Sequence, residues 1–346
     1  MANAQQNLAA NAPALVNPLE DAGIPWRLGV TTTDNGNPRC TGTSPEGGIL
    51  VMSSCRARLS DFELDGLDVG DLSCQDACGV DSLGVLPTAT EVDATVKPRK
   101  WLESVNGETN VSVPIYDALA CMLPQGINGC GFESQLESAY LAVARAQSSQ
   151  EDNWGFLGAD SLLVVIFVSD EADCSYNKNF GEIFEGNKTF WSDPSAAAPT
   201  SAVCWNAGVE CIGDPSGYDS CLPANKDVNG AITNDPGKAV MQPIERYVDG
   251  LQTDIGPVLV FGILGVSSDG SVAYADAVDP AFQKDYGIGP GCMAQVPLGQ
   301  PITAVPPVRM LAVMDELGGA NMAFSICDSD YSPALSAMGK KIASYF

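Results

Sequence analysis

The 346-residue sequence contains no histidine. This absence excludes catalysis by Ser-His-Asp or Cys-His groups, zinc sites with histidine ligands and acid–base chemistry by an imidazole ring. Any enzyme built on this sequence would have to use carboxylates, lysine, serine or a metal ion.

Basic residues are scarce: 17 Lys and Arg stand against 43 Asp and Glu, which gives a formal net charge of −26. A protein that binds nucleic acid needs a basic surface to neutralise phosphates, so this class of partner is excluded. A surface of this charge repels copies of itself and attracts cations.

Long apolar runs are also missing. No stretch approaches the roughly 18 apolar residues of a membrane-spanning helix, and we expect no membrane span. Residues 1–6 (MANAQQ) have neither the basic nor the apolar part of a signal peptide.

Cysteine, in contrast, is abundant, with 12 residues in local groups of even size. Such counts without zinc spacing favour disulfides formed in an oxidising compartment. We therefore expect up to six bridges, in the mature or truncated part of a longer exported precursor that acts outside the cell or on its surface. We expect Cys121–Cys130 and Cys292–Cys327, because each pair flanks core elements. The other cysteines are Cys40, Cys55, Cys74 and Cys78, then Cys174, Cys204, Cys211 and Cys221.

One stretch of seven apolar residues, Leu162–Val168, predicts a strand buried on both faces, as in the middle of a parallel sheet. Three carboxylates follow within four residues: Asp170, Glu171 and Asp173. Ligands of open α/β sheets bind beyond the carboxyl ends of the strands, and Mg²⁺ and Ca²⁺ take oxygen ligands. These acids are therefore candidate cation ligands. The alternative is that they cap a helix or face solvent.

Predicted helices and strands alternate along the chain. This order predicts one α/β domain over residues 1–346 with a doubly wound, mainly parallel sheet. Three stretches rich in Gly, Ser, Asp and Cys, at about 35–80, 172–237 and 269–305, are predicted to be disulfide-pinned loop insertions. Besides Leu162–Val168, strands are expected at 24–34, 257–265 and 322–327, and helices at 2–22, 114–122, 132–143, 243–251, 307–317 and 333–345.

Five segments stand out in order along the chain: Arg27–Asp34 (RLGVTTTD), Gly129–Ala139 (GCGFESQLESA), Val165–Ser175 (VIFVSDEADCS), Pro307–Leu311 (PVRML) and Ser325–Tyr331 (SICDSDY). Together they resemble the von Willebrand factor A-like domains of exported bacterial proteins, notably those of the myxobacterial type. The resemblance implies a Rossmann-like sheet with a metal-ion-dependent adhesion site on its upper face. In such domains an Asp-x-Ser-x-Ser turn after the first strand, a Thr on a second loop and an Asp after the fourth strand hold a divalent cation. An acidic group of a partner protein often completes the coordination.

Asp170 matches the third of these elements, whereas the second loop carries Glu133 and no Thr at the usual place. The first strand and its turn are missing, because the sequence opens in the helix that would follow them. An α/β sheet without its central strand would expose unpaired edges. We therefore expect either a boundary upstream of Met1 or a strand donated by another segment or subunit.

The candidate ligands for Mg²⁺ or Ca²⁺ are thus Asp170, Glu171, Glu133 and Asp173, as the remnant of a site that is incomplete in this sequence. Arg309 lies inside an otherwise apolar predicted helix. We expect it to pair with an acid near the sheet, and a ligand role is the alternative.

These observations favour a non-catalytic, secreted or cell-surface module for protein binding or adhesion, with the three insertions as its contact surface. One alternative is a structural subunit of an extracellular appendage or surface assembly, a homo-oligomer in which a neighbour supplies the missing strand. A second alternative is a metal-dependent hydrolase that uses Asp170, Glu171 and Asp173.

Overall fold

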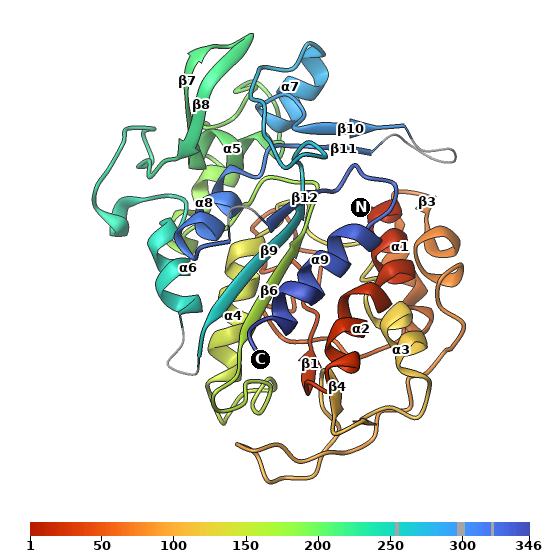
Figure 1. The fold of residues 1–346 in the computed structure, drawn as a ribbon. Helices are drawn as coiled ribbons and strands as arrows, with labels where there is room; N and C mark the ends of the chain where they lie inside the picture. Colours follow the sequence, from red (N-terminus) through yellow and green to blue (C-terminus); the bar gives the residue numbers. More distant parts are fainter. Residues whose placement is uncertain (253–255, 296–301, 320–321) are drawn as a thin grey trace.

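The computed structural model of the chain describes residues 1–252, 256–295, 302–319 and 322–346 (Figure 1). At its centre lies a three-stranded parallel sheet of β6 (Leu163–Val168), β9 (Val258–Leu264) and β12 (Ala323–Ser325), in the order β12-β9-β6. Val165 of β6 lies opposite Val260 of β9. Every residue of β6 (LVVIFV) is apolar, and β9 (VLVFGIL) is apolar apart from one glycine, as is typical of strands buried in a sheet.

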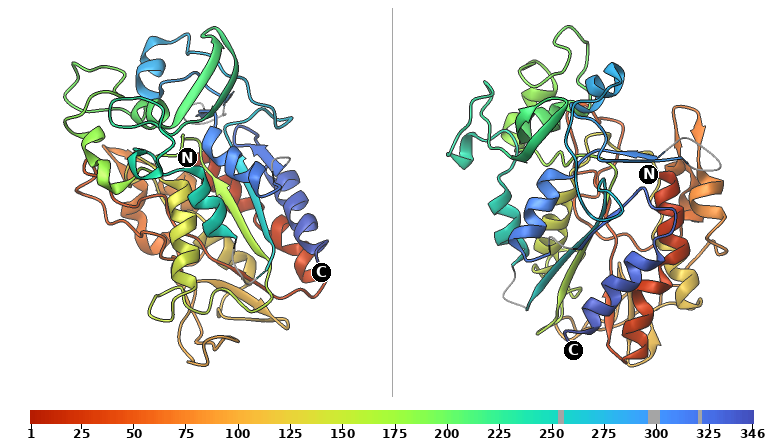
Figure 2. Two further views of the ribbon diagram at one scale, coloured as in Figure 1. Left: turned by 90° about the vertical axis from the view of Figure 1, so that its left-hand side faces the viewer. Right: turned by 45° about the horizontal axis from the view of Figure 1, so that its top comes forward.

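Helices cover both faces of this sheet (Figures 1 and 2). Successive side chains of a strand point to opposite faces, so Leu163 and Phe167 lie in one hydrophobic cluster and Val164 and Ile166 contact another. The first cluster includes residues of α4 (Gln135–Ala146), α6 (Ile244–Leu251) and α8 (Val308–Glu316). The second includes residues of α1 (Ala2–Asn11), α2 (Pro13–Asp21), α3 (Ile115–Met122) and α9 (Ser332–Ala343).

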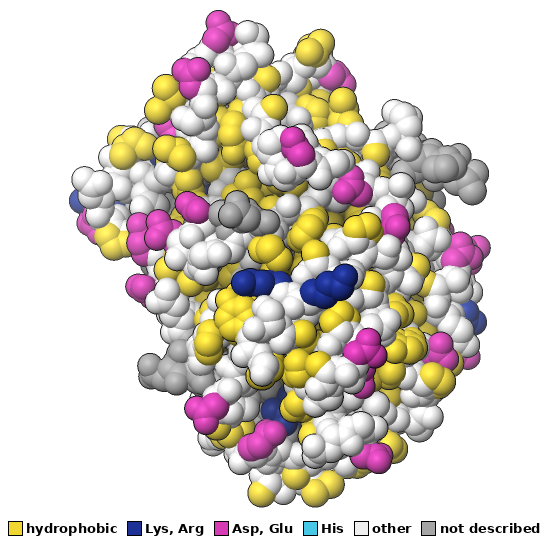
Figure 3. Space-filling view, in the orientation of Figure 1, with side chains coloured by type: hydrophobic (Ala, Val, Ile, Leu, Met, Phe, Trp, Pro, Cys, Tyr) yellow, Lys and Arg dark blue, Asp and Glu magenta, His cyan; other side chains and the backbone are white. Residues whose placement is uncertain are grey.

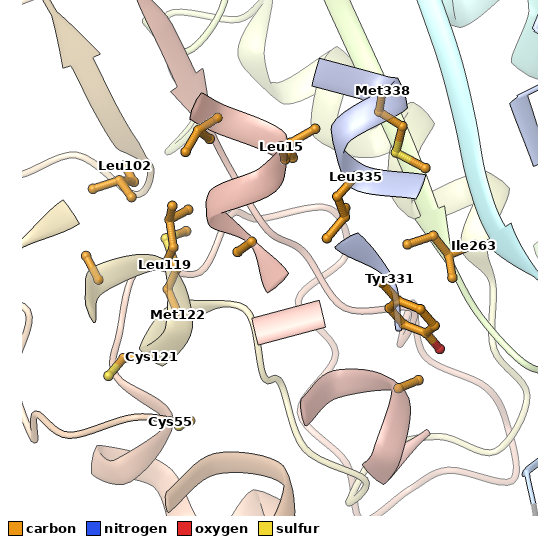
Figure 4. Close-up of a cluster of buried hydrophobic side chains, with 14 of the residues drawn as sticks. Leu15, Cys55, Leu102, Leu119, Cys121, Met122, Ile263, Tyr331, Leu335 and Met338 are labelled. Carbon is orange, nitrogen blue, oxygen red and sulfur yellow. The ribbon is translucent and has the colours of Figure 1, made fainter. Parts of the chain in front are cut away.

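Helices α2 and α9 pack closely on the second face. Figure 4 shows Leu15 of α2 beside Leu335 and Met338 of α9. Gly339 makes this approach possible, because a Cβ atom at that position would lie 2.2 Å from the backbone oxygen of Leu15. A side chain at Gly339 would therefore push the two helices apart.

The prediction that residues 24–34 form a strand of the parallel sheet is wrong. β1 (Trp26–Leu28) pairs antiparallel with β4 (Leu102–Val105), and β4 continues into β5 (Glu108–Thr109). Asn106 and Gly107 both have positive φ, as the two-residue turn of this hairpin requires. These strands form a separate sheet, since an apolar run by itself does not specify which edge it pairs with.

Two of the predicted insertions gather above the carboxyl ends of β6 and β9 (Figures 1 and 2). Residues 202–223 and 269–294 contact one another there, and Tyr218 N donates to Tyr274 O at 2.8 Å. We call these two segments the loop layer. It contains α5 (Ala202–Gly208), β7 (Val209–Asp214), β8 (Gly217–Pro223), α7 (Pro280–Tyr286) and β10 (Cys292–Ala294), which pairs with β11 (Ile302–Ala304).

The remaining elements are short. Residues 35–80 hold the hairpin of β2 (Glu63–Leu64) and β3 (Leu67–Asp68), a 3₁₀ segment at Cys55–Phe62 and a π-helical turn at Asp71–Gln75. Further 3₁₀ segments lie at Lys178–Phe184 and Pro236–Lys238. No helix among the described residues is both long enough and apolar enough to cross a bilayer.

All 12 cysteines form disulfides, as many as the sequence predicted. The expected bridge Cys292–Cys327 is confirmed. The expected bridge Cys121–Cys130 is wrong, because Cys121 faces the segment before Val80 and the loop of Cys130 lies against that of Cys40. The bridges are Cys40–Cys130, Cys55–Cys74, Cys78–Cys121, Cys174–Cys204, Cys211–Cys221 and Cys292–Cys327.

Candidate functional site at the carboxyl end of strand β6

Three loops meet where β6 ends. The loop of residues 169–175 follows the strand directly, and the loop of residues 131–134 leads into α4. Cys174 N donates to Glu133 O at 2.7 Å, and Ser134 N donates to Thr33 O at 2.9 Å, which brings in the third loop after β1. Backbone hydrogen bonds thus place Glu133, Asp170 and Glu171 in one neighbourhood, as the sequence predicted for the carboxyl end of this strand.

Asp173 is held by the protein's own donors. Its Oδ1 accepts hydrogen bonds from Leu136 N at 3.0 Å, at the start of α4, and from Ser175 Oγ at 2.6 Å. Its Oδ2 accepts from Arg309 Nε at 2.9 Å. Both charged side chains are buried, with 0% of Asp173 and 2% of Arg309 exposed. The predicted pairing of Arg309 with an acid near the sheet is confirmed, and neither oxygen of Asp173 is left for a cation.

Asp170 and Glu133 have different surroundings. Asp170 Oδ2 accepts a hydrogen bond from the amino group of Met1 at 2.7 Å, and 18% of the Asp170 side chain is exposed. Glu133 Oε2 accepts from Gln135 Nε2 at 3.2 Å and from Ser169 Oγ at 3.4 Å. We call Glu133, Asp170 and Glu171 the acidic cluster.

The carboxylates of the acidic cluster disfavour one another's ionisation. Burial, followed by repulsion from Asp170, raises the pKa of Glu133 to about 7. Burial and then the charges of Glu133 and Asp170 raise the pKa of Glu171 well above its ordinary value. The cluster therefore retains protons near neutral pH that isolated carboxyl groups would have lost.

The acidic cluster lies beneath the loop layer. Tyr286 at the end of α7 has its pKa raised to about 12, first by burial and then by the charges of Glu171 and Asp170. The backbone also links the cluster to the strand that pairs with β10, since Val305, directly after β11, donates its N–H to Asp170 O at 2.9 Å.

The residues present do not fit a Mg²⁺ or Ca²⁺ site in this arrangement. Such ions need several oxygen ligands around one point. Among the described residues, no three carboxylates place their oxygens within 4.8 Å of one another. Asp173 is paired with Arg309, and Asp170 is paired with an ammonium group.

Three sulfur atoms do come that close together, those of Cys55, Cys74 and Cys78. All three are oxidised, in the bridges Cys55–Cys74 and Cys78–Cys121. Metals bind thiolates, so this group offers ligands only when both bridges are reduced.

Several residues of this region were not foreseen from the sequence. Glu137 on α4 accepts hydrogen bonds from Arg246 Nη2 at 2.9 Å and from Tyr247 OH at 3.0 Å, which ties α4 to α6. Gln135 Nε2 also donates to Ser169 Oγ at 2.7 Å and so connects the two loops below the acidic cluster. Both are buried polar side chains in the first turn of α4, and no pattern in the sequence distinguishes them from exposed ones.

Two open pockets of about 470 and 500 Å³ are present in the described structure. The first pocket lies between residues 46–52 and residues 98–100. The second lies in the loop layer, against Trp205 and Tyr218. Neither is lined by the acidic cluster. The cluster is thus a charged patch at the end of a strand and not the floor of either pocket.

Comparison with models of protein families, with curated proteins and with solved structures finds no match for this chain.

Proposed function

We propose that the chain is a non-catalytic protein-binding module of von Willebrand factor A type that works outside the cell or on its surface. The observation that carries this proposal is the loop layer, a rigid surface with apolar side chains exposed on it. Figure 3 shows apolar side chains along the upper part of the molecule, over β7 and β8.

The hairpin of β7 and β8 explains this exposure. Cys211 lies opposite Cys221 in the ladder, and their disulfide faces the cluster of buried residues below the hairpin. Ile212 and Leu222 point to the other side, because neighbouring residues of a strand alternate. They are 60% and 58% exposed. Two large apolar side chains on the outer face of a bridged hairpin are typical of a contact surface.

Disulfides pin this surface to the scaffold. Cys174–Cys204 holds the loop after β6 to α5, and Cys292–Cys327 holds β10 to the end of β12. Binding specificity is commonly placed on loops that a rigid scaffold positions, and stiff loops lose little entropy when a partner binds. Six disulfides also favour an oxidising compartment as the place of action.

We infer no catalytic activity at the carboxyl end of β6. The sequence has no histidine, and the Asp173 carboxylate is committed to Arg309. The metal-dependent hydrolase stays an alternative, and the response of the thermal midpoint to Mg²⁺ and Ca²⁺ tests it.

Binding of the fluorescently labelled chain to the surface of the cells that produce it tests the proposal. We expect Ile212→Asp and Leu222→Asp each to weaken binding about tenfold or more, because central apolar contacts dominate interfaces. The matched control is Val96→Asp. Val96 is 68% exposed in the loop that leads to β4. Figure 1 shows β4 at the end of the molecule opposite β7 and β8. Equal effects of all three substitutions, or none, would contradict a contact through the loop layer.

A further inference from the structure

Strand β6 has one open edge. It pairs with β9 on one side, and no other strand in the described part of the chain pairs with it. Leu163 N donates to Pro257 O at 3.0 Å, and Ser169 N donates to Ile263 O at 3.2 Å, so odd-numbered residues face β9. In a parallel ladder the backbone groups of alternate residues point to opposite sides. The N–H and C=O groups of Val164, Ile166 and Val168 therefore point to the open side, where the described residues offer them no strand.

The sequence of β6 is typical of a strand in the interior of a sheet and not of an edge strand. Natural edge strands are usually interrupted by lysine, proline or a bulge that prevents further pairing. β6 reads LVVIFV and has none of these features. Its middle residues Val164, Val165 and Ile166 are only partly buried, whereas Val260 and Phe261 of the neighbouring strand are fully buried. Solvent reaches apolar side chains at this edge that a further strand would cover.

Both faces beside the edge are apolar. Val164 and Ile166 contact the cluster of α2 and α9, and Phe167 lies in the cluster of α4 and α6. A strand added here would have its side chains against one cluster or the other at every position. Such a strand must be apolar on both faces, unlike a strand with one face in water.

Charge further restricts the occupant. The acidic cluster lies at the carboxyl end of β6, and its three carboxyl groups have no cationic side chain among their described ion-pair partners. A segment with acidic residues at this end would be repelled, whereas a neutral or basic one is compatible. The open edge thus selects for an apolar segment without acids next to Asp170.

We propose that the open edge of β6 takes up an extended apolar segment of about six residues from a partner polypeptide, which hydrogen-bonds to Val164, Ile166 and Val168 and completes the sheet. This form of recognition is β-strand addition. It rests on the proposed protein-binding function in that the partner is a protein, but it uses a surface separate from the loop layer. In a second copy of the chain, β9 is paired on both sides, so that copy could offer only the open edge of its own β6. A concentration-dependent dimer in non-denaturing solution would favour that source and contradict a separate partner.

Hydrogen exchange of the intact, oxidised chain, read by NMR at single amides, tests this proposal. In the chain alone, the amides of Val164, Ile166 and Val168 should exchange much faster than those of Val165 and Phe167, which are bonded to β9. The probe is a synthetic peptide with the sequence of Val258–Leu264 between pairs of lysines. At millimolar concentration it should slow the exchange of the three open-edge amides at least tenfold and leave Val165 and Phe167 unchanged.

Two controls separate backbone pairing from attraction of a basic peptide to an acidic protein. The same peptide, N-methylated at alternate residues on the side that meets β6, keeps its charge and apolar surface but cannot donate to the ladder. It should give no protection. Ile166→Pro removes one donor from the open edge and keeps the ladder to β9, since proline is tolerated where its nitrogen faces away from the neighbouring strand. This variant should keep slow exchange at Val165 and Phe167 and bind the peptide at least tenfold more weakly.

The proposal is wrong if the three amides are already as protected as Val165 and Phe167 in the monomeric chain. It is also wrong if the peptide leaves their exchange unchanged, or if the N-methylated peptide protects them equally. Ile212→Asp should bind the peptide like the unsubstituted chain, so failure of β-strand addition and failure of the loop-layer contact are distinguishable.

Discussion

Asp170 and Asp173 lie three residues apart in the loop after β6, and the structure gives them opposite surroundings. Asp173 is fully buried and pairs with Arg309 at 2.9 Å, with further hydrogen bonds from Leu136 N and Ser175 Oγ. Asp170 is partly exposed and lies in the acidic cluster, where Glu133 and Glu171 retain protons that ordinary carboxyl groups lose. Asp173 stabilises the fold through its ion pair with Arg309. Asp170, in contrast, contributes to the raised pKa values of Glu133 and Glu171.

This difference shows that a run of acids does not by itself define a binding site. The partners of each carboxylate come from distant segments of the chain. Asp173 contacts Arg309 on α8, and Asp170 lies near Glu133 in the loop before α4. Asp173 has a permanent cationic side chain as its partner, whereas the described ion pairs give the acidic cluster none.

The largest effect is expected from removing the charge of Asp173. Asp173→Asn leaves the guanidinium of Arg309 buried without a counter-ion, and we expect the free energy of unfolding to fall by about 3–5 kcal/mol. Urea unfolding of the oxidised protein measures this. The double variant Asp173→Asn with Arg309→Met removes both charges and should recover a large part of the loss. A loss below about 1 kcal/mol in the single variant would show that the pair contributes no more than an exposed ion pair does.

A smaller effect on the free energy of unfolding, of opposite sign, is expected from replacing Glu133 by a residue that does not ionise. The pKa of Glu133 is raised from 4.5 to about 7 in the folded chain. Between these values the folded state binds more protons than the unfolded state, so this group makes stability fall as pH rises through the window. The contribution is on the order of 3 kcal/mol.

Glu133→Gln stays neutral and should lack this part of the pH dependence. Urea unfolding of both proteins at several pH values between about 4.5 and 7.5 isolates the difference. The variant should gain stability over the unsubstituted chain as pH increases, because burial and the charge of Asp170 no longer oppose an ionised group. A difference that does not change with pH would contradict a raised pKa of Glu133.

The smallest effect is expected from divalent cations. Since the acidic cluster does not gather its oxygens around one point, millimolar Mg²⁺ or Ca²⁺ should leave the thermal midpoint unchanged. Binding to the folded state alone would raise it. The matched variant is Asp170→Asn. A rise in the unsubstituted chain that this variant abolishes would show that the cluster rearranges around a cation, and would favour the metal-dependent hydrolase.

The sequence was most informative where short-range pattern decides the outcome. Seven consecutive apolar residues predicted β6, and apolar spacing predicted α4, α6, α8 and α9. Both predictions succeed because the spacing of apolar residues along a short segment reflects which of its faces are buried. Arg309 in an apolar helix predicted a buried partner for the same reason: a charge there must be compensated.

The sequence was least informative about which distant segments meet. The strand at 24–34 was expected in the parallel sheet, but β1 pairs with β4, whose hairpin partner β5 depends on the turn at Asn106 and Gly107. The ion pair of Glu137 and Arg246 joins two helices 109 residues apart, and no local signal identifies either residue as the other's partner. Likewise, three neighbouring acids predicted a cation site, whereas the distances between their oxygens depend on three loops meeting.

The disulfide connectivity has a consequence for how the chain acquires its bridges. Five of the six join cysteines that follow one another along the chain, and Cys40–Cys130 alone spans others, enclosing Cys55–Cys74 and Cys78–Cys121. If each cysteine were oxidised with the next one in the order of synthesis, Cys40 would join Cys55. Cys74 would then join Cys78, and Cys121 would join Cys130, so none of the first three bridges would be native. The last six cysteines would pair correctly by the same rule. Thiol–disulfide exchange to correct mispairing is therefore needed only in the first 130 residues. The bridges at and above the carboxyl ends of β6 and β12 can form as soon as both of their cysteines have been synthesised.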